Sequence, residues 1–109
     1  MKPKLFGSSG IRGLANIDIT PTLAQRVGAA TATIHEGGTT IIGRDARKTG
    51  PMLEAALTSG VNAAGGDVYQ VGLVPTPVVA WMITETGAKS GVEITASHNP
   101  PPYNGLKVF

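Results

Sequence analysis

The sequence contains no cysteine, few aromatic residues and no run of basic residues. Without cysteine, the chain can form no disulfide, no zinc–thiolate site and no cysteine nucleophile. Its aromatic residues are one Trp, two Tyr and two Phe, so the core has to be built from Val, Ile, Leu, Ala and Met. The net charge of +2 is small and is not clustered, which argues against binding nucleic acid by bulk charge.

The sequence also lacks a hydrophobic run of the roughly 20 residues that a membrane span needs. Residues 1–5 do not contain the apolar segment of a signal peptide. We therefore expect a cytoplasmic protein without a membrane anchor. Its 109 residues, 41% of them hydrophobic, suit one globular domain. The chain stops inside an apolar strand at 106–109, which is unusual, so we expect residues 1–109 to be one domain of a longer enzyme; a complete small domain is the alternative.

Helical and strand patterns alternate along the chain. Thr20 and Pro21 are typical of a helix start, and paired glycines end the first two helices. The patterns predict helices over 21–36, 51–64 and 77–86, and strands over 39–43, 67–73, 92–95 and 106–109. Such alternation favours an α/β fold, a three-layer α/β/α sandwich with a mixed, mostly parallel sheet. The last strand follows a loop, so we expect it to run antiparallel to its neighbour.

The segment 91–109 contains the most reactive side chains. Ser97, His98 and Asn99 follow the strand 92–95, and three prolines come directly after them. Each proline fixes φ at about −65° and removes a backbone donor, so this loop should be stiff enough to position a nucleophile. The Asn104–Gly105 pair predicts a tight turn that would bring Lys107 back toward Ser97.

Residue types alone leave the role of Ser97 open. An ordinary turn serine is the simplest interpretation. A hydrolase would need a base, but His98 is the adjacent residue, which on an extended chain points to the other side, and no G-x-S-x-G motif is present. Ser97 could instead carry a phosphoryl group. Its charge of about −1.5 to −2 would then have to be offset by Lys107, Arg12, helix dipoles and a metal ion.

Two other segments contain candidate anion-binding groups. The glycines of 7–13 have the spacing G-x-x-G-x-x-G, which is not a dinucleotide motif; free backbone N–H groups and Arg12 could bind an anion there, or the segment could be a flexible loop. The segment 43–49 lacks the second glycine of a phosphate-binding P-loop. Asp45 could pair with Arg44 or with Arg47, as a surface cluster or as the edge of an active site.

Several of these segments match one family. T-A-S-H-N-P at 95–100, followed by Y-N-G-L-K at 103–107, resembles the phosphoserine loop of the α-D-phosphohexomutases, the phosphoglucomutase/phosphomannomutase family. S-S-G-I-R-G at 8–13, the G-R-D-x-R-x-[ST] pattern at 43–49 and P-T-P at 75–77 agree with it. The resemblance covers essentially the whole chain, but only the first of the four domains of such enzymes.

The resemblance implies an enzyme that interconverts hexose 1-phosphate and hexose 6-phosphate. Ser97, as phosphoserine, would give its phosphoryl group to the sugar, and hexose 1,6-bisphosphate would be the intermediate and activator. Position by position, the implied catalytic residues are Ser97, His98, Lys107 and Arg12. The implied phosphate or substrate contacts are Ser9, Asn99 and Arg44.

The resemblance also implies a cofactor and partners. Mg²⁺ would bind the phosphate on Ser97 and an aspartate triplet, D-G-D-G-D-R, of the second domain, which is absent from this sequence. The expected partners are a phosphosugar and the remaining domains of the same enzyme, with a homo-oligomer left open. Glucose, mannose and glucosamine phosphates are all compatible with these motifs, and a phosphate-binding module without catalysis is the alternative.

Overall fold

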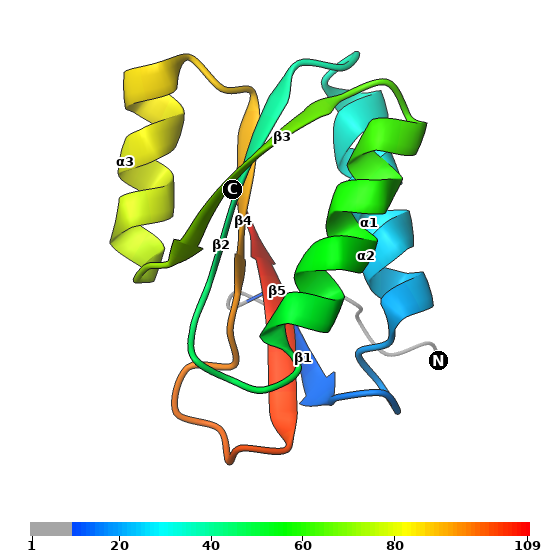
Figure 1. Cartoon of the computed structure of the whole chain (residues 1–109), viewed down its shortest axis with the longest axis vertical. Helices are drawn as coiled ribbons and strands as arrows, with labels where there is room; N and C mark the ends of the chain where they lie inside the picture. Colours follow the sequence, from blue (N-terminus) through cyan, green and yellow to red (C-terminus); the bar gives the residue numbers. More distant parts are fainter. Residues whose placement is uncertain (1–9) are drawn as a thin grey trace.

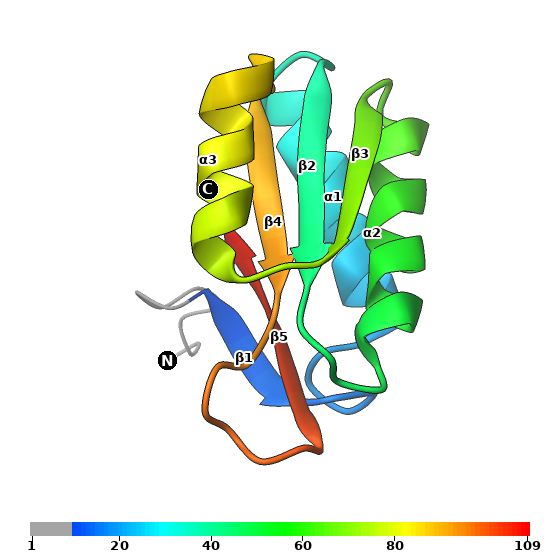
Figure 2. The same ribbon diagram turned by 60° about the vertical axis from the view of Figure 1, so that its left-hand side comes forward.

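The computed structural model describes residues 10–109, which form a five-stranded sheet with helices on both faces (Figure 1). The elements in chain order are β1 (Ile11–Leu14), α1 (Pro21–Ile34), β2 (Thr39–Arg44), α2 (Gly50–Ala63), β3 (Asp67–Leu73), α3 (Thr76–Thr86), β4 (Ser90–Ile94) and β5 (Tyr103–Val108). Helices α1 and α2 cover one face of the sheet, and α3 lies on the other (Figure 2). The predicted three-layer α/β/α sandwich is confirmed.

The sheet has the strand order β1-β5-β4-β2-β3. Strand β2 pairs in parallel with both β3 and β4, and β5 runs antiparallel to β4, as predicted. Strand β1, which pairs antiparallel with β5, was not predicted. The glycine spacing of 7–13 indicated an anion-binding or flexible loop, whereas residues 11–13 of that segment belong to β1 at the edge of the sheet. Among residues 10–109, two strand pairings are parallel and two antiparallel, so the sheet is mixed, as predicted, but not mostly parallel.

Helix α1 begins where the sequence indicated, because the Thr20 hydroxyl accepts a hydrogen bond from the Leu23 N–H at 3.1 Å. Its buried face does not extend to the apolar residue Ile34 at its C-terminal end. That side chain is 75% exposed. The helix packs instead on α2 through small residues: a side chain at Gly28 would collide with the Leu57 carbonyl, and one at Gly60 with the Gln25 carbonyl. Close backbone approach thus decides which face is buried.

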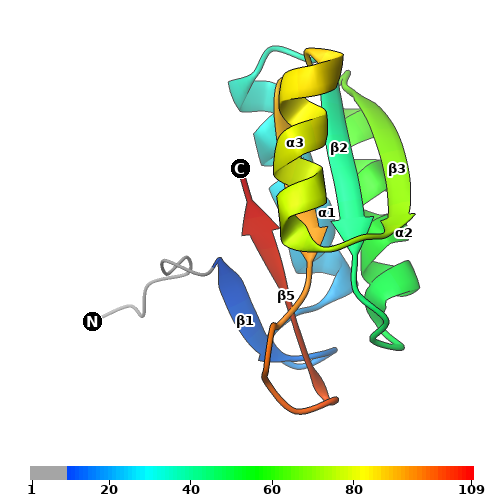
Figure 3. The same cartoon turned by 90° about the vertical axis from the view of Figure 1, so that its left-hand side faces the viewer.

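Strand β4 is covered on both faces. Its Val92 and Ile94 belong to the core shared with α1 and α2. On the other face, Val79 and Ile83 of α3 lie against Gly91. Helix α3 covers β2 and β4, while β5 and β1 lie beyond its edge (Figure 3). One side of the sheet therefore stays open beside the end of β4.

The carboxyl ends of β2 and β4 lie at the same end of the sheet, at the bottom of Figure 1. The loops that follow them, the aspartate loop (residues 45–49) and the serine loop (residues 95–102), meet there. This is the end at which open α/β sheets bind ligands. Within residues 10–109, no helix is both long enough and apolar enough to cross a membrane.

Candidate active site

Ser97 adopts a conformation that the sequence did not predict. Its φ is +55°, in the left-handed region that residues other than glycine seldom occupy. Its backbone N–H donates to the Thr95 hydroxyl at 3.0 Å, and its own side chain is exposed. The loop therefore presents the Ser97 hydroxyl to solvent at the end of β4.

The left-handed turn also brings His98 to the same side as Ser97. The serine Oγ lies 3.3 Å from both ring nitrogens, so the expectation that the two side chains diverge is wrong, because it assumed an extended chain. An oxygen equidistant from both nitrogens lies along the lone pair of neither. A directed hydrogen bond, as a hydrolase requires, is therefore not formed, although turning the exposed ring would bring one nitrogen to the hydroxyl.

Arg47 holds the serine loop in shape. Its guanidinium group donates to four backbone carbonyls: Nη1 to Pro100 O at 2.8 Å and to Tyr103 O at 3.0 Å, and Nη2 to Ser97 O at 2.9 Å and to Asn99 O at 2.8 Å. The loop curls around this one planar group, whose fixed fork of donors suits several acceptors at once. The carbonyl of the strained residue is one of the four.

Asp45 connects Arg47 to the end of β4. Its Oδ1 accepts from the Arg47 backbone N–H at 3.1 Å, and its Oδ2 accepts from Arg47 Nε at 3.2 Å and from the Thr95 hydroxyl at 2.7 Å. The same hydroxyl accepts from the Ser97 N–H. A continuous chain of hydrogen bonds thus joins the aspartate loop to the backbone of Ser97.

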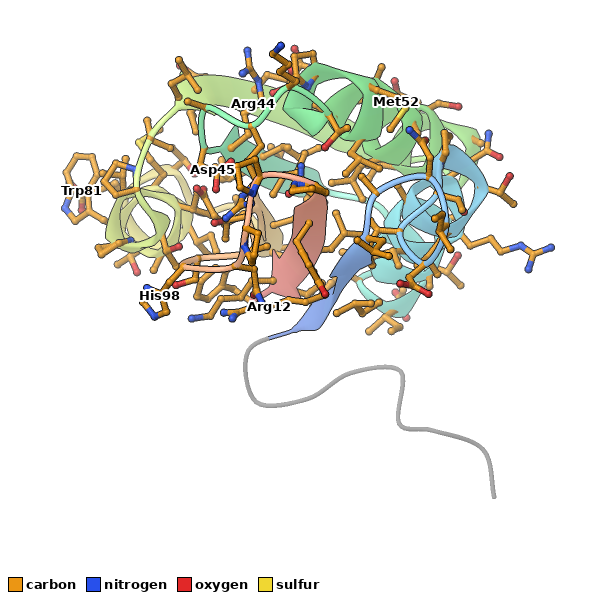
Figure 4. The ribbon with its side chains drawn as sticks, turned by 90° about the horizontal axis from the view of Figure 1, so that it is seen from below. Arg12, Arg44, Asp45, Met52, Trp81 and His98 are labelled. Carbon is orange, nitrogen blue, oxygen red and sulfur yellow. The ribbon has the colours of Figure 1, made fainter. Side chains whose placement is uncertain are left out.

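The structure distinguishes the two arginines that the sequence left as alternatives. Arg44, one of the predicted phosphate contacts, lies 3.5 Å from Glu54 Oε1 through its Nε and sits toward β3 and α2 (Figure 4). Arg47 is the residue that reaches the serine loop. Its role was missed because its partners are backbone carbonyls some 50 residues away, which no local pattern marks.

The predicted turn at Asn104–Gly105 is wrong, because both residues lie inside β5. The chain reverses earlier, where the Tyr103 N–H donates to the Pro100 carbonyl at 3.0 Å. The prolines, with their fixed φ, already supply the turn. Asn104 is instead buried, and its side-chain amide donates to the Thr49 hydroxyl at 2.8 Å.

Arg12 and Lys107 lie on the open face of the sheet. Arg12 is opposite Gly105 across β1 and β5, and its Nη1 lies 3.4 Å from Asn99 Oδ1 at the edge of the serine loop; Figure 4 shows Arg12 and His98 next to that loop. Lys107 lies opposite Glu93. Within residues 10–109, neither cation donates to the Ser97 hydroxyl. Ser9, the remaining predicted contact, is outside the described residues.

Glu93 is the second residue that the sequence interpretation missed. Its place between Val92 and Ile94 is typical of the polar face of a strand, but it is 1% exposed, because α3 covers that face. Burial, and to a smaller extent the nearby Asp45 carboxylate, raise its pKa from 4.5 to about 7. One sequence feature could have identified Glu93: it is a carboxyl group in the central strand of a sheet that is covered on both faces.

Residues 10–109 do not hold a metal site of their own. They contain no group of three or more His, Asp or Glu side chains that could bind one ion, and the Asp45 oxygens already accept hydrogen bonds.

Comparison with known proteins identifies the family of this chain. Residues 3–109 match the model of the family described as phosphoglucomutase/phosphomannomutase, alpha/beta/alpha domain I. A phosphoglucosamine mutase of Rhodococcus erythropolis is 49% identical over 97% of this chain, and a probable phosphoglucosamine mutase of Pyrococcus abyssi is 51% identical over 97%.

Solved structures give the same result. A phosphoglucomutase/phosphomannomutase family protein of Burkholderia thailandensis superimposes with a TM-score of 0.82 at 36% identity over 95% of this chain, and a putative phosphomannomutase of Thermus thermophilus with 0.83 at 34% over 94%. The chain belongs to the phosphoglucomutase/phosphomannomutase family and corresponds to its domain I. It spans about a quarter of the length of these relatives.

Proposed function

We propose that this chain is the first of four domains of a phosphohexomutase and that Ser97 carries the phosphoryl group. The enzyme would interconvert hexose 1-phosphate and hexose 6-phosphate through hexose 1,6-bisphosphate. The observation that supports this most directly is the exposed Ser97 hydroxyl on a loop that Arg47 fixes through four carbonyls. Phosphoryl transfer depends mainly on positioning and on stabilising charge, and this loop supplies the positioning.

The proposed reaction has two matched transfers. In the first, the bond between Ser97 Oγ and phosphorus breaks, a bond between phosphorus and a sugar oxygen forms, the sugar hydroxyl loses its proton and Oγ gains one. In the second, the other phosphoryl group of the bisphosphate returns to Oγ with the reverse proton movements. His98, whose ring nitrogens lie 3.3 Å from Oγ, is placed to exchange that proton after a turn of its ring.

The cations of the open face would stabilise the phosphoryl group. A serine phosphate has a charge of about −1.5 to −2 at neutral pH. Arg12 lies at the edge of the loop through Asn99, and Lys107 occupies the same face of the sheet. We assign both to phosphate or substrate contact, and Asn99 to the rim of the site. Mg²⁺, if it takes part, would gain its other ligands from the remaining domains.

Among hexose phosphates, glucosamine phosphate is the first substrate to test. Two relatives that are 49% and 51% identical to this chain are named as phosphoglucosamine mutases, one of them as probable, whereas the structural neighbours have phosphomannomutase or family names. The motifs at 8–13 and 95–100 are compatible with glucose, mannose and glucosamine phosphates alike. We therefore assign the selection to the other domains.

Phosphopeptide mass spectrometry of the enzyme that contains this domain tests the proposal. After incubation with hexose 1,6-bisphosphate, the peptide with Ser97 should carry one phosphate, and Ser97→Ala should abolish both the label and most of the mutase turnover. Ser59→Ala, an exposed change on α2, is the control and should alter neither. Normal turnover in Ser97→Ala would overturn the proposal. The isolated 109-residue chain should give no product, and turnover by it would show that the other domains are dispensable.

A further inference from the structure

Glu93 occupies an unusual position beside the candidate site. In the sheet it lies directly between Gly43 of β2 and Lys107 of β5. Strand alternation places all three on the face that α3 partly covers, opposite Val92, Ile94 and the core. The carboxyl group therefore belongs to the same face as the lysine that we assign to the phosphate.

The carboxyl group is buried without a hydrogen-bond partner. Within the described residues, its Oε1 is inaccessible to solvent and accepts no hydrogen bond. It lies over Gly43, where an added Cβ would be 2.6 Å from Oε1 and 2.7 Å from methyl groups of Val74 and Val79. The glycine thus leaves room for the carboxyl. A buried acceptor without a donor is costly, so a missing partner is expected.

Lys107 has no carboxylate partner in this arrangement. Its Nζ lies 5.6 Å from the centre of the Phe109 ring, and neither of the two ion pairs found among residues 10–109 includes it. The side chain is half-buried. A cation and an unpaired carboxyl therefore occupy neighbouring positions on adjacent strands without contact.

The other charged groups near Glu93 already have partners or lie on the other face of the sheet. From β2, Arg44 lies on the opposite face with Glu54, and Asp45 is a carboxylate bonded to Arg47 and Thr95. Helix α3 contributes Val79 at this point and no titratable group. Among the described residues, Lys107 is thus the one cation opposite Glu93.

We propose that Glu93 is a positioning residue for Lys107. When no phosphate is present at Ser97, the carboxylate takes the ammonium group as a cross-strand ion pair; when a phosphate is present, the ammonium group turns toward it. The pairing itself stands on the sheet geometry alone. The release to a phosphate rests on the proposed function.

The geometry makes this exchange simple. Adjacent strands are about 4.8 Å apart, and opposite side chains on one face of an antiparallel pair are within reach of each other. Rotation of the two side chains is then enough, with no backbone movement. The pKa of unpaired Glu93 is about 7. A nearby cation that lowers this pKa therefore changes the charge of the carboxyl group at neutral pH. The lysine would keep a counter-ion throughout a cycle in which the phosphate leaves and returns.

Nuclear magnetic resonance of the 109-residue chain tests the pairing. The carboxyl-carbon signal of Glu93 is followed from pH 4 to 9 in wild type and in Lys107→Met. We expect the titration midpoint of Glu93 to rise by at least half a pH unit in the variant, because an ion pair favours the charged form. Lys48→Met, which removes an exposed lysine of the aspartate loop, is the matched control and should shift it much less. Lys107→Gln replaces the first variant if that one does not fold.

A second measurement tests whether the Lys107 ammonium group leaves Glu93 when an anion is present. Sulfate keeps its charge over this range, so the wild-type titration is repeated with sulfate and with sodium chloride at the same ionic strength. Sulfate should raise the Glu93 midpoint toward that of Lys107→Met and have no effect in the variant. An unchanged midpoint in Lys107→Met would overturn the pairing. A midpoint that responds to Lys107→Met but not to sulfate would overturn the release, whatever phosphopeptide analysis shows for Ser97.

Discussion

Replacing Arg47 should loosen the serine loop far more than replacing Arg44. In Arg47→Met, four backbone carbonyls lose their donor, and Asp45 loses its ion-pair partner. Each hydrogen bond contributes about 0.5–1.5 kcal/mol net, and water can reach part of the vacated loop. We therefore expect the free energy of unfolding to fall by about 2–4 kcal/mol.

Arg47→Lys is the sharper variant, because it keeps the charge. Lysine has three N–H donors on one nitrogen and no planar fork, so it cannot satisfy the four carbonyls and Asp45 together. The expected loss is about 1–2 kcal/mol. Arg44→Lys is the matched control: it makes the same change at the last residue of β2, where the ion-pair partner among the described residues is Glu54 at 3.5 Å, and should cost less than about 1 kcal/mol.

Urea denaturation followed by circular dichroism measures these free energies, and amide hydrogen exchange locates the effect. The N–H groups of Asn99 and Tyr103 donate to carbonyls within the loop turn and should lose protection in Arg47→Lys but not in Arg44→Lys. Equal losses of stability in the two lysine variants, with equal protection of both amides, would refute the view that Arg47 maintains the loop.

Three other predictions follow from single positions. Ser97→Gly should be more stable to urea than Ser97→Ala by about 1 kcal/mol, because glycine adopts the φ of +55° without strain; equal stabilities would contradict this. Burial, with the Asp45 carboxylate, raises the pKa of unpaired Glu93 from 4.5 to about 7, so in the Lys107→Met variant the folded state keeps a proton that the unfolded chain loses, and its stability should fall by up to about 3 kcal/mol as pH rises through that window. Adding Glu93→Gln to that variant should remove the fall in thermal melts at pH 5 and pH 8, and parallel behaviour of the two proteins would count against the assignment. Asn104→Ala should cost about 1–3 kcal/mol, because it leaves the Thr49 hydroxyl without its buried donor at 2.8 Å; a wild-type urea midpoint would show that this bond is replaceable.

The sequence predicted the elements with regular periods and missed the features that depend on contacts between them. The helices, β2, β3 and β4 have periods and caps that act locally, so their places were predicted to within a few residues. Strand β1 is short and glycine-rich, and it is a strand only because β5 pairs with it. The Asn104–Gly105 pair has the residue types of a turn, yet the prolines before it had already reversed the chain.

For the candidate site, the sequence predicted the position of the serine loop but not what holds it. Ser97, His98 and Asn99 are neighbours in the chain, so their grouping needed no tertiary information. Arg47 meets the loop across about 50 residues, and Glu93 is buried only because α3 packs over β4. Both depend on how separate elements come together, which local patterns do not encode.

The dependence of the serine loop on Arg47 has a consequence for protein engineering. Residues 95–102 are continuous in the sequence, yet their conformation depends on the guanidinium group of Arg47 in the aspartate loop. Transplanting only those residues onto a foreign scaffold would transfer the hydroxyl and lose its presentation. A workable graft has to bring the aspartate loop with it, in the spacing that β2 and β4 impose.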